Sequence, residues 1–204
     1  MLMRIAVMAS GEGTGLQALL DAERNGRLKS GRIVLVLSER EDSESLDRAR
    51  RFGIKAVAVI RRQFNDRAAF EKRLLEALKS SDIDVIVLAG FFCILSGEFI
   101  SHYPGRIINV HPSLIPSFSG KGCYGLKVHE AALKAGVKVS GATVHVVNEI
   151  PDGGKILMQK AVEVMPDDTP YTLQQRVKEQ AEWKILPEAA ELFCKSLKER
   201  KQGE

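Results

Sequence analysis

The sequence predicts an α/β protein with a single domain, in which a mostly parallel sheet is covered by helices on both faces. The apolar segments of the first half are continuous runs rather than alternating ones, as is typical of strands buried on both sides. Stretches with a helical apolar stripe separate these runs. A length of 204 residues allows one domain with a good core but is short for two.

Strands and helices alternate along the first half of the chain. Strands are expected at residues 4–9, 32–37, 55–59, 84–88 and 106–110, with helices at about 16–26, 43–52 and 66–80. Right-handed crossovers between parallel strands give a twisted, Rossmann-like sheet. Ligands of such sheets bind beyond the carboxyl ends of the strands, so we expect the site to follow Ala9, Leu88 and Val110.

The second half has a different pattern. Residues 140–147 alternate small or polar with apolar side chains, and residues 155–164 have the character of a partner strand. The sequence Pro-Asp-Gly-Gly at 151–154 is typical of a turn between them. We therefore predict an added antiparallel pair of strands, followed by a long terminal helix from about Thr172.

Composition restricts the classes of partner. Lys and Arg exceed Asp and Glu by 30 − 26 = 4, a surplus that suits an anionic small substrate but does not by itself indicate nucleic acid. The three cysteines have no metal-ligand spacing. The longest apolar run, Val85–Leu95, is too short to cross a bilayer, and the start lacks the apolar core of a signal peptide. We expect a cytoplasmic protein with reduced thiols, no metal, no nucleic acid and no membrane partner.

A glycine-rich loop, Ser-Gly-Glu-Gly-Thr-Gly-Leu at residues 10–16, joins the first strand to the first helix. Backbone amides at a helix start, with no Cβ in the way, form a phosphate site, although the loop could also be only a tight turn. A dinucleotide site would use Glu39 as the ribose-binding acid. The spacing G-x-G-x-G differs from the dinucleotide pattern G-x-G-x-x-G, which favours a single phosphate monoester.

Polar residues gather where the fifth strand ends. Asn109 and His111 stand two positions apart, and Asp152 lies in the turn between the two added strands. An amide can hold a developing oxyanion, an imidazole can move a proton, and a carboxylate can orient the imidazole. Together they suit acyl transfer to an amine without a Ser or Cys nucleophile, and Ser113 is expected only to cap the proline-flanked turn. Taken singly, His111 could be a satisfied core histidine and Asp152 a turn residue.

These motifs resemble the phosphoribosylglycinamide formyltransferase family, the folate-dependent enzymes of purine synthesis. The resemblance runs from Arg4 to about Pro187 and is carried by "SGEGTGLQ", "VLAGFFCILS", "NVHPSLIPSF", "GVKVSGATVHVV", "DGGKIL" and "AEWKILP". It implies transfer of a formyl group from 10-formyltetrahydrofolate, as cosubstrate, to the amine of glycinamide ribonucleotide, by a monomer or a homodimer. It also implies a single formyltransferase domain, with a phosphate-binding βαβ half (1–110) and a folate-binding and closing half (111–204).

The resemblance implies roles for individual residues. Asn109, His111 and Asp152 take the catalytic places. The ribonucleotide is expected at Gly13, Thr14, Gly15, Glu179, Gln180, Ala181 and Glu182, and the formyl-folate at Arg67, Phe92, Cys93, Ile94, Leu95, Asn109, Asn148, Glu149, Ile150, Pro151 and Asp152.

Five positions depart from the usual pattern of the family: Glu12, Gly15, Glu39, Cys93 and Trp183. Glu12 places a negative charge beside the proposed anion site, which weakens binding unless the side chain points away. Other classes remain open at this point. They are a related folate-dependent formyltransferase or hydrolase that acts on another amine, a nucleotide-binding module without catalysis, and a nicotinamide oxidoreductase.

Overall fold

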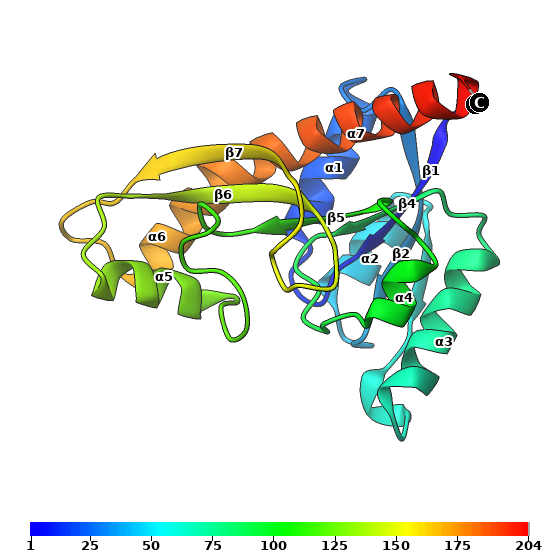
Figure 1. The fold of residues 1–204 in the computed structure, drawn as a ribbon, viewed down its shortest axis with the longest axis horizontal. Helices are drawn as coiled ribbons and strands as arrows, with labels where there is room; N and C mark the ends of the chain where they lie inside the picture. Colours follow the sequence, from blue (N-terminus) through cyan, green and yellow to red (C-terminus); the bar gives the residue numbers. More distant parts are fainter. Residues whose placement is uncertain (204) are drawn as a thin grey trace.

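The computed structural model describes residues 1–203 and has one seven-stranded sheet (Figure 1). Its strands are β1 (Met3–Met8), β2 (Gly31–Ser38), β3 (Lys55–Ala58), β4 (Val85–Leu88), β5 (Ile107–His111), β6 (Val139–Val146) and β7 (Ile156–Glu163). Their order across the sheet is β3-β2-β1-β4-β5-β6-β7. The first five pair in parallel, whereas β6 and β7 are antiparallel additions. The predicted fold class is confirmed.

The helices cover both faces of this sheet. They are α1 (Thr14–Arg24), α2 (Glu44–Arg51), α3 (Arg67–Lys79), α4 (Gly97–Ser101), α5 (Leu126–Lys134), α6 (Pro170–Val177) and α7 (Trp183–Gly203). Side chains of α1, α2, α6 and α7 share one buried cluster, and those of α3 and α4 form the other. Residues 5–8 of β1 alternate between the two clusters, which explains why this part of the strand is a continuous apolar run.

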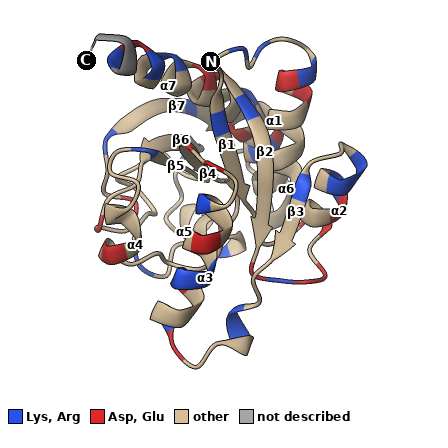
Figure 2. Ribbon diagram, turned by 90° about the vertical axis from the view of Figure 1, so that its right-hand side faces the viewer, with Lys and Arg blue, Asp and Glu red and all other residues tan. Residues whose placement is uncertain are grey.

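Charged side chains of both signs are mixed along the outer helices. Figure 2 shows Lys and Arg beside Asp and Glu on α2 and α3 rather than in a stripe of one sign. None of the helices described in the structure has the length and apolar character needed to span a bilayer.

The terminal helix differs from the single long helix predicted from about Thr172. It begins earlier, at Pro170, because Thr169 caps its first turn by accepting a hydrogen bond from the Thr172 amide. A π-helical turn, Lys178–Glu182, then separates α6 from α7. Such a turn inserts an extra residue into the helical repeat and changes which side chains face inward. The short helix α4 was also absent from the predicted elements.

The turn that carries Asp152 depends on a close backbone approach at Gly154. A Cβ on Gly154 would lie 1.6 Å from the carbonyl oxygen of Val146, a distance that no side chain tolerates. Only glycine allows the chain to pass here between the two added strands.

We expect Gly154→Ala to lower the free energy of unfolding by about 1–3 kcal/mol, because the new methyl group forces the turn away from β6. Thermal unfolding should show a loss of several degrees (~2–4 °C per kcal/mol for a chain of this size). Gly11→Ala is the matched control, since its Cβ would meet no atom within 4 Å. Equal melting temperatures for the two variants would contradict this account of the turn.

Candidate active site

A cavity of about 500 Å³ opens at the carboxyl ends of β1, β4 and β5, where the sheet topology predicts a ligand. Its wall contains residues 11–15, 88–95 and 109–112 from these three strand ends. Parts of the loop at 120–125, the turn at 147–152 and the α6 region complete it. A cavity therefore lies at the position predicted from Ala9, Leu88 and Val110.

The cavity brings together most of the predicted site residues. Those in its wall are Gly13, Thr14, Gly15, Phe92, Cys93, Ile94, Leu95, Asn109, His111, Asn148, Glu149, Ile150, Pro151, Asp152 and Glu182. Four others are not part of the wall: Arg67, Glu179, Gln180 and Ala181. Arg67 is paired with Glu71, whose carboxylate lies 2.9 Å from its Nε. The roles expected for these four residues stay predictions.

The glycine loop presents backbone amides to the cavity. Gly13 is the N-cap of α1 with a φ of 69°, and a Cβ there would lie 2.8 Å from the Cα of Ser45. The loop carbonyls are held elsewhere: Ser43 Oγ donates to Gly11 O, and Arg48 Nε donates to Glu12 O at 2.7 Å. Gly13 has no side chain to satisfy the first amides of α1. The loop therefore has the geometry of an anion site at a helix start.

Two of the positions that depart from the family pattern, Glu39 and Cys93, have surroundings that limit what their side chains can do. Glu39 accepts a hydrogen bond from Ser10 Oγ at 2.6 Å and is not part of the cavity wall, so it does not take the position of a ribose-binding acid. Burial raises the pKa of the Cys93 thiol to about 11, which keeps it protonated and unreactive at neutral pH.

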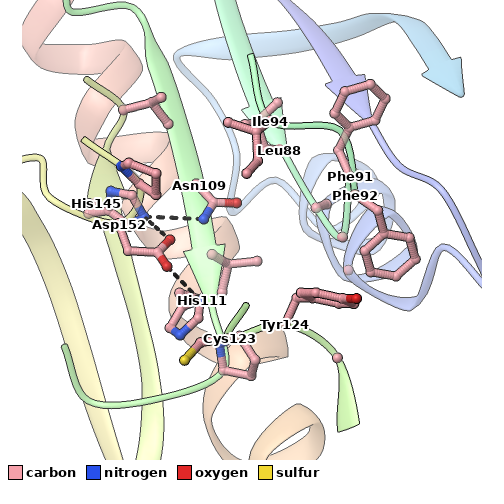
Figure 3. Close-up of a pocket in the computed structure, with 18 of the residues that line it drawn as sticks. Leu88, Phe91, Phe92, Ile94, Asn109, His111, Cys123, Tyr124, His145 and Asp152 are labelled. Carbon is pink, nitrogen blue, oxygen red and sulfur yellow. Dashed lines mark hydrogen bonds and ion pairs between the residues drawn. The ribbon is translucent and has the colours of Figure 1, made fainter. Parts of the chain in front are cut away.

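Four polar side chains form a connected cluster in the cavity wall. Figure 3 shows Asn109, His145, Asp152 and His111 joined in this order. The Asn109 Nδ2 atom lies 3.1 Å from His145 Nε2. One oxygen of the Asp152 carboxylate lies 3.5 Å from His145 Nε2, and the other lies 3.5 Å from His111 Nδ1. The three residues predicted from the sequence thus lie together, with a second histidine among them.

His111 is buried and fixed at both ring nitrogens. Its Nε2 donates to the carbonyl oxygen of Phe118 at 2.9 Å, while Nδ1 faces Asp152. The proline-flanked turn that follows is closed by Ser113, whose hydroxyl donates to the Ser117 carbonyl at 2.5 Å. Ser113 therefore caps the turn, as predicted, and is not a nucleophile paired with His111.

His145 is the cluster residue that the sequence analysis missed. The alternating pattern of its strand indicated only a packed position, but antiparallel pairing places His145 directly opposite Asn109. A shift in the β6–β7 register falls between Val144 and His145, and such bulges often lie beside functional sites. His145 Nδ1 lies 3.1 Å from the Val146 carbonyl and can donate to it, which leaves Nε2 to accept from Asn109 when the ring is neutral.

The Asp152 carboxylate is stabilised as an anion. Burial alone raises its pKa, but the interaction with His145, the hydrogen bond from the Gly120 amide and the charge of His111 outweigh burial and hold the pKa below its usual value. Asp152 also has a φ of 56°, in the left-handed region that Asp and Asn tolerate better than most residues. The cluster thus contains a fixed negative charge between two imidazoles.

The cavity wall contains a second polar group, on α5 and the π-helical turn. Burial raises the pKa of the Glu182 carboxyl to about 7, although the nearby charge of Lys178 opposes the shift. Burial also lowers the pKa of His129 to about 4, so this ring is neutral at physiological pH. Its two nitrogens are buried without a hydrogen-bond partner among the described residues. Glu182 and His129 are thus left with hydrogen-bonding capacity at the cavity wall.

Comparison with known proteins agrees with the class of protein that the fold and the polar cluster in its cavity indicate, a group-transfer enzyme. The sequence profile described as formyl transferase matches residues 3–190. The chain belongs to the formyl transferase family.

Named relatives cover most of the chain. Phosphoribosylglycinamide formyltransferase of Escherichia coli (strain K12) is 39% identical, over 87% of this chain and 81% of that protein. The trifunctional purine biosynthetic protein adenosine-3 of Bos taurus is 43% identical over 94% of this chain, which spans only 18% of that relative's length. The crystal structure of glycinamide ribonucleotide transformylase 1 from Symbiobacterium toebii has a TM-score of 0.89 and 41% identity, covering 96% of this chain and 89% of that one.

The raised pKa of Glu182 predicts a pH-dependent cost to stability. An acid whose folded pKa lies above its ordinary value of 4.5 destabilises the fold increasingly as the pH rises from about 4.5 to about 7, because the folded state retains the proton longer than the unfolded state. Glu182→Gln should therefore stabilise the ligand-free protein at pH 8 by ~1–3 kcal/mol and much less at pH 5.

Urea denaturation at the two pH values measures this difference. Glu188→Gln, at an exposed position on α7, is the control and should show no such trend. A stabilisation by Glu182→Gln that is the same at pH 5 and pH 8 would show that the carboxyl does not titrate in this range.

Proposed function

We propose that the protein transfers a formyl group from 10-formyltetrahydrofolate to the amine of glycinamide ribonucleotide, a reaction of purine biosynthesis. The observation that carries this proposal is the Asn109–His145–Asp152–His111 cluster in the same cavity as a helix start suited to phosphate. The E. coli and S. toebii proteins to which the chain is similar bear the names of this activity.

In the proposed arrangement the ribonucleotide lies along the α1 side of the cavity. Its phosphate accepts hydrogen bonds from the amides around Gly13, Thr14 and Gly15, at the positive end of α1. Its ribose hydroxyls meet Glu182. The pterin lies between residues 92–95 and 148–152, where an apolar segment faces a polar turn. The predicted division into a phosphate-binding half, residues 1–110, and a folate-binding half, residues 111–204, stays a prediction. In the proposed arrangement residues 92–95, which belong to the first half, also contact the folate.

The chemistry follows from direct attack by the glycine amine on the formyl carbon. A C–N bond forms to the amine, and the bond from the formyl carbon to the folate nitrogen then breaks. The formyl oxygen becomes negative in the intermediate. The amide nitrogen of Asn109 carries two hydrogens. It can therefore donate one hydrogen bond to His145 and a second to this oxygen.

His111 supports the same intermediate as a cation. Both of its nitrogens face acceptors, Asp152 and the Phe118 carbonyl, so a ring that carries two protons donates to both. Electrostatic support of the oxyanion requires no movement of the ring. Transfer of a proton from the attacking amine to the leaving nitrogen through His111 requires the Phe118 contact at Nε2 to open, so this loop is part of the proposed proton route.

The reaction is tested by incubating the purified protein with 10-formyltetrahydrofolate and glycinamide ribonucleotide and measuring formylated product. A pterin-containing antifolate should raise the melting temperature, whereas NAD should not. Absence of product with both substrates, or a larger shift with NAD, would overturn the proposal. The oligomeric state, expected to be a monomer or a homodimer, can be measured on the same sample.

Removal of the Asp152 charge should separate chemistry from binding. Asp152→Asn keeps the shape and suits the left-handed backbone, but it leaves the two histidines without their anion. We expect kcat to fall about 10²–10⁴-fold with the KM of both substrates nearly unchanged. Asn109→Ala and His111→Ala should have similar effects, and combined losses should be less than additive because the groups act as one unit. Near-normal turnover in His111→Ala would remove this histidine from the mechanism.

His145 should act through Asn109 rather than on the substrate. His145→Ala frees the Asn109 amide and removes one contact of Asp152, so kcat should fall by ~10–100-fold, as for other supporting residues. His145→Gln, which can still accept from Asn109, should recover part of this loss. If both variants lose stability but retain kcat, His145 has a structural role only.

A further inference from the structure

An ion pair joins the two walls of the cavity at its ribonucleotide end. Lys178 Nζ lies 3.2 Å from Glu12 Oε2, although the residues are 166 positions apart in the sequence. Glu12 belongs to the glycine loop and Lys178 begins the π-helical turn, and both are part of the cavity wall. The side chain of Glu12 is 66% exposed and that of Lys178 is 21% exposed. The carboxylate can therefore swing into solvent, whereas the ammonium faces the cavity.

We propose that Glu12 is an internal competitor for Lys178, which it holds beside the glycine loop until the substrate phosphate displaces the carboxylate and takes the ammonium. This inference rests on the proposed function, because it assigns the ribonucleotide phosphate to that loop. It names Lys178 as the cation of the phosphate site and Glu12 as the residue that sets the affinity of the site.

Lys178 is the cation placed to change partners. Arg48 also lies against the loop, but its guanidinium is occupied by the Glu12 carbonyl at 2.7 Å, Gln17 Oε1 at 3.1 Å and the Glu44 carboxylate at 3.7 Å. It thereby fixes the loop backbone. Lys178 is instead paired with the carboxylate of the residue that directly precedes the N-cap Gly13. An anion at the start of α1 therefore arrives beside the ammonium.

The exchange is favourable on charge grounds. A largely exposed ion pair between single charges is weak, whereas a phosphate monoester carries about −1.5 to −2 charges at pH 7. The phosphate also receives the amides of α1, which the Glu12 carboxylate does not use in the ligand-free protein. Once displaced, Glu12 lies near a group of its own sign and is stabilised by water. Its presence therefore lowers phosphate affinity without preventing binding.

Substitution of Glu12 should tighten the site. Glu12→Gln removes the competing charge, and we expect the KM for glycinamide ribonucleotide to fall about fivefold, the factor that corresponds to ~1 kcal/mol. The KM for the formyl-folate and kcat should stay within a factor of about two, since the pair is at the ribonucleotide end. Glu41→Gln, an exposed change beyond the cavity wall, is the control.

The opposite change separates competition from simple repulsion. Lys178→Met should raise the ribonucleotide KM at least about tenfold, as for the loss of a charge-assisted contact, while the exposed control Lys184→Met should not. In the Lys178→Met background, Glu12→Gln should give a smaller improvement than in the wild type, because no ammonium is left to release. An equal improvement in both backgrounds would show that Glu12 acts by repulsion alone and would overturn the proposed competition.

Inorganic phosphate tests the site without turnover. Its stabilisation of the protein in thermal unfolding should be larger for Glu12→Gln than for the wild type, and smaller for Lys178→Met. This result would support the inference even if the wild type made no formylated product, an outcome that would reject only the proposed reaction. Equal stabilisation of all three proteins by phosphate, together with normal turnover by the wild type, would reject the inference and leave the proposed function standing.

Discussion

The carboxylate of Asp152 is the constraint on which the arrangement of the cavity wall depends. It contacts His111 from β5, His145 from β6 and the Gly120 amide from the loop that follows β5. An anion in this position is costly to bury, so each of these contacts is needed to keep it charged. The turn that delivers it is equally constrained, because Asp152 has a positive φ and Gly154 lies against the Val146 carbonyl. The antiparallel strand pair therefore serves mainly to place one charge beside two imidazoles.

The parallel part of the fold and three of the four cluster residues could be predicted from the sequence because their causes are local. A strand such as β1, buried on both faces, must be a continuous apolar run, and the polar Asn109 and His111 at the end of β5 break that rule where the topology places a ligand. The glycine loop could also be predicted, because the φ of 69° at Gly13 favours glycine at that position.

The remaining features depend on contacts between distant segments. His145 in an alternating strand has the same sequence pattern whether it packs in a core or faces Asn109, and only the β5–β6 register decides between them. The π-helical turn interrupts a stretch whose apolar stripe continues on both sides, so periodicity predicts an unbroken helix. The pairing of Glu12 with Lys178 joins residues that are 166 positions apart, so no local pattern predicts it.

The two ends of the cavity follow different electrostatic rules. At the Asp152 end the carboxylate contacts both imidazoles and the Gly120 amide, so the groups proposed to stabilise the reacting centre are already fixed in place. On the Lys178 side, the buried His129 ring has no hydrogen-bond partner among the described residues, the pKa of Glu182 is raised, and the ammonium is paired with a largely exposed carboxylate. Buried polar groups without hydrogen-bond partners lower the stability of a protein. A ligand rich in hydroxyls and negative charge supplies the missing partners and removes this loss of stability when it binds. Under the proposed function, the ribonucleotide gains its binding energy from the groups near Lys178 that lack partners, whereas the groups proposed for the chemistry are already held in place around Asp152.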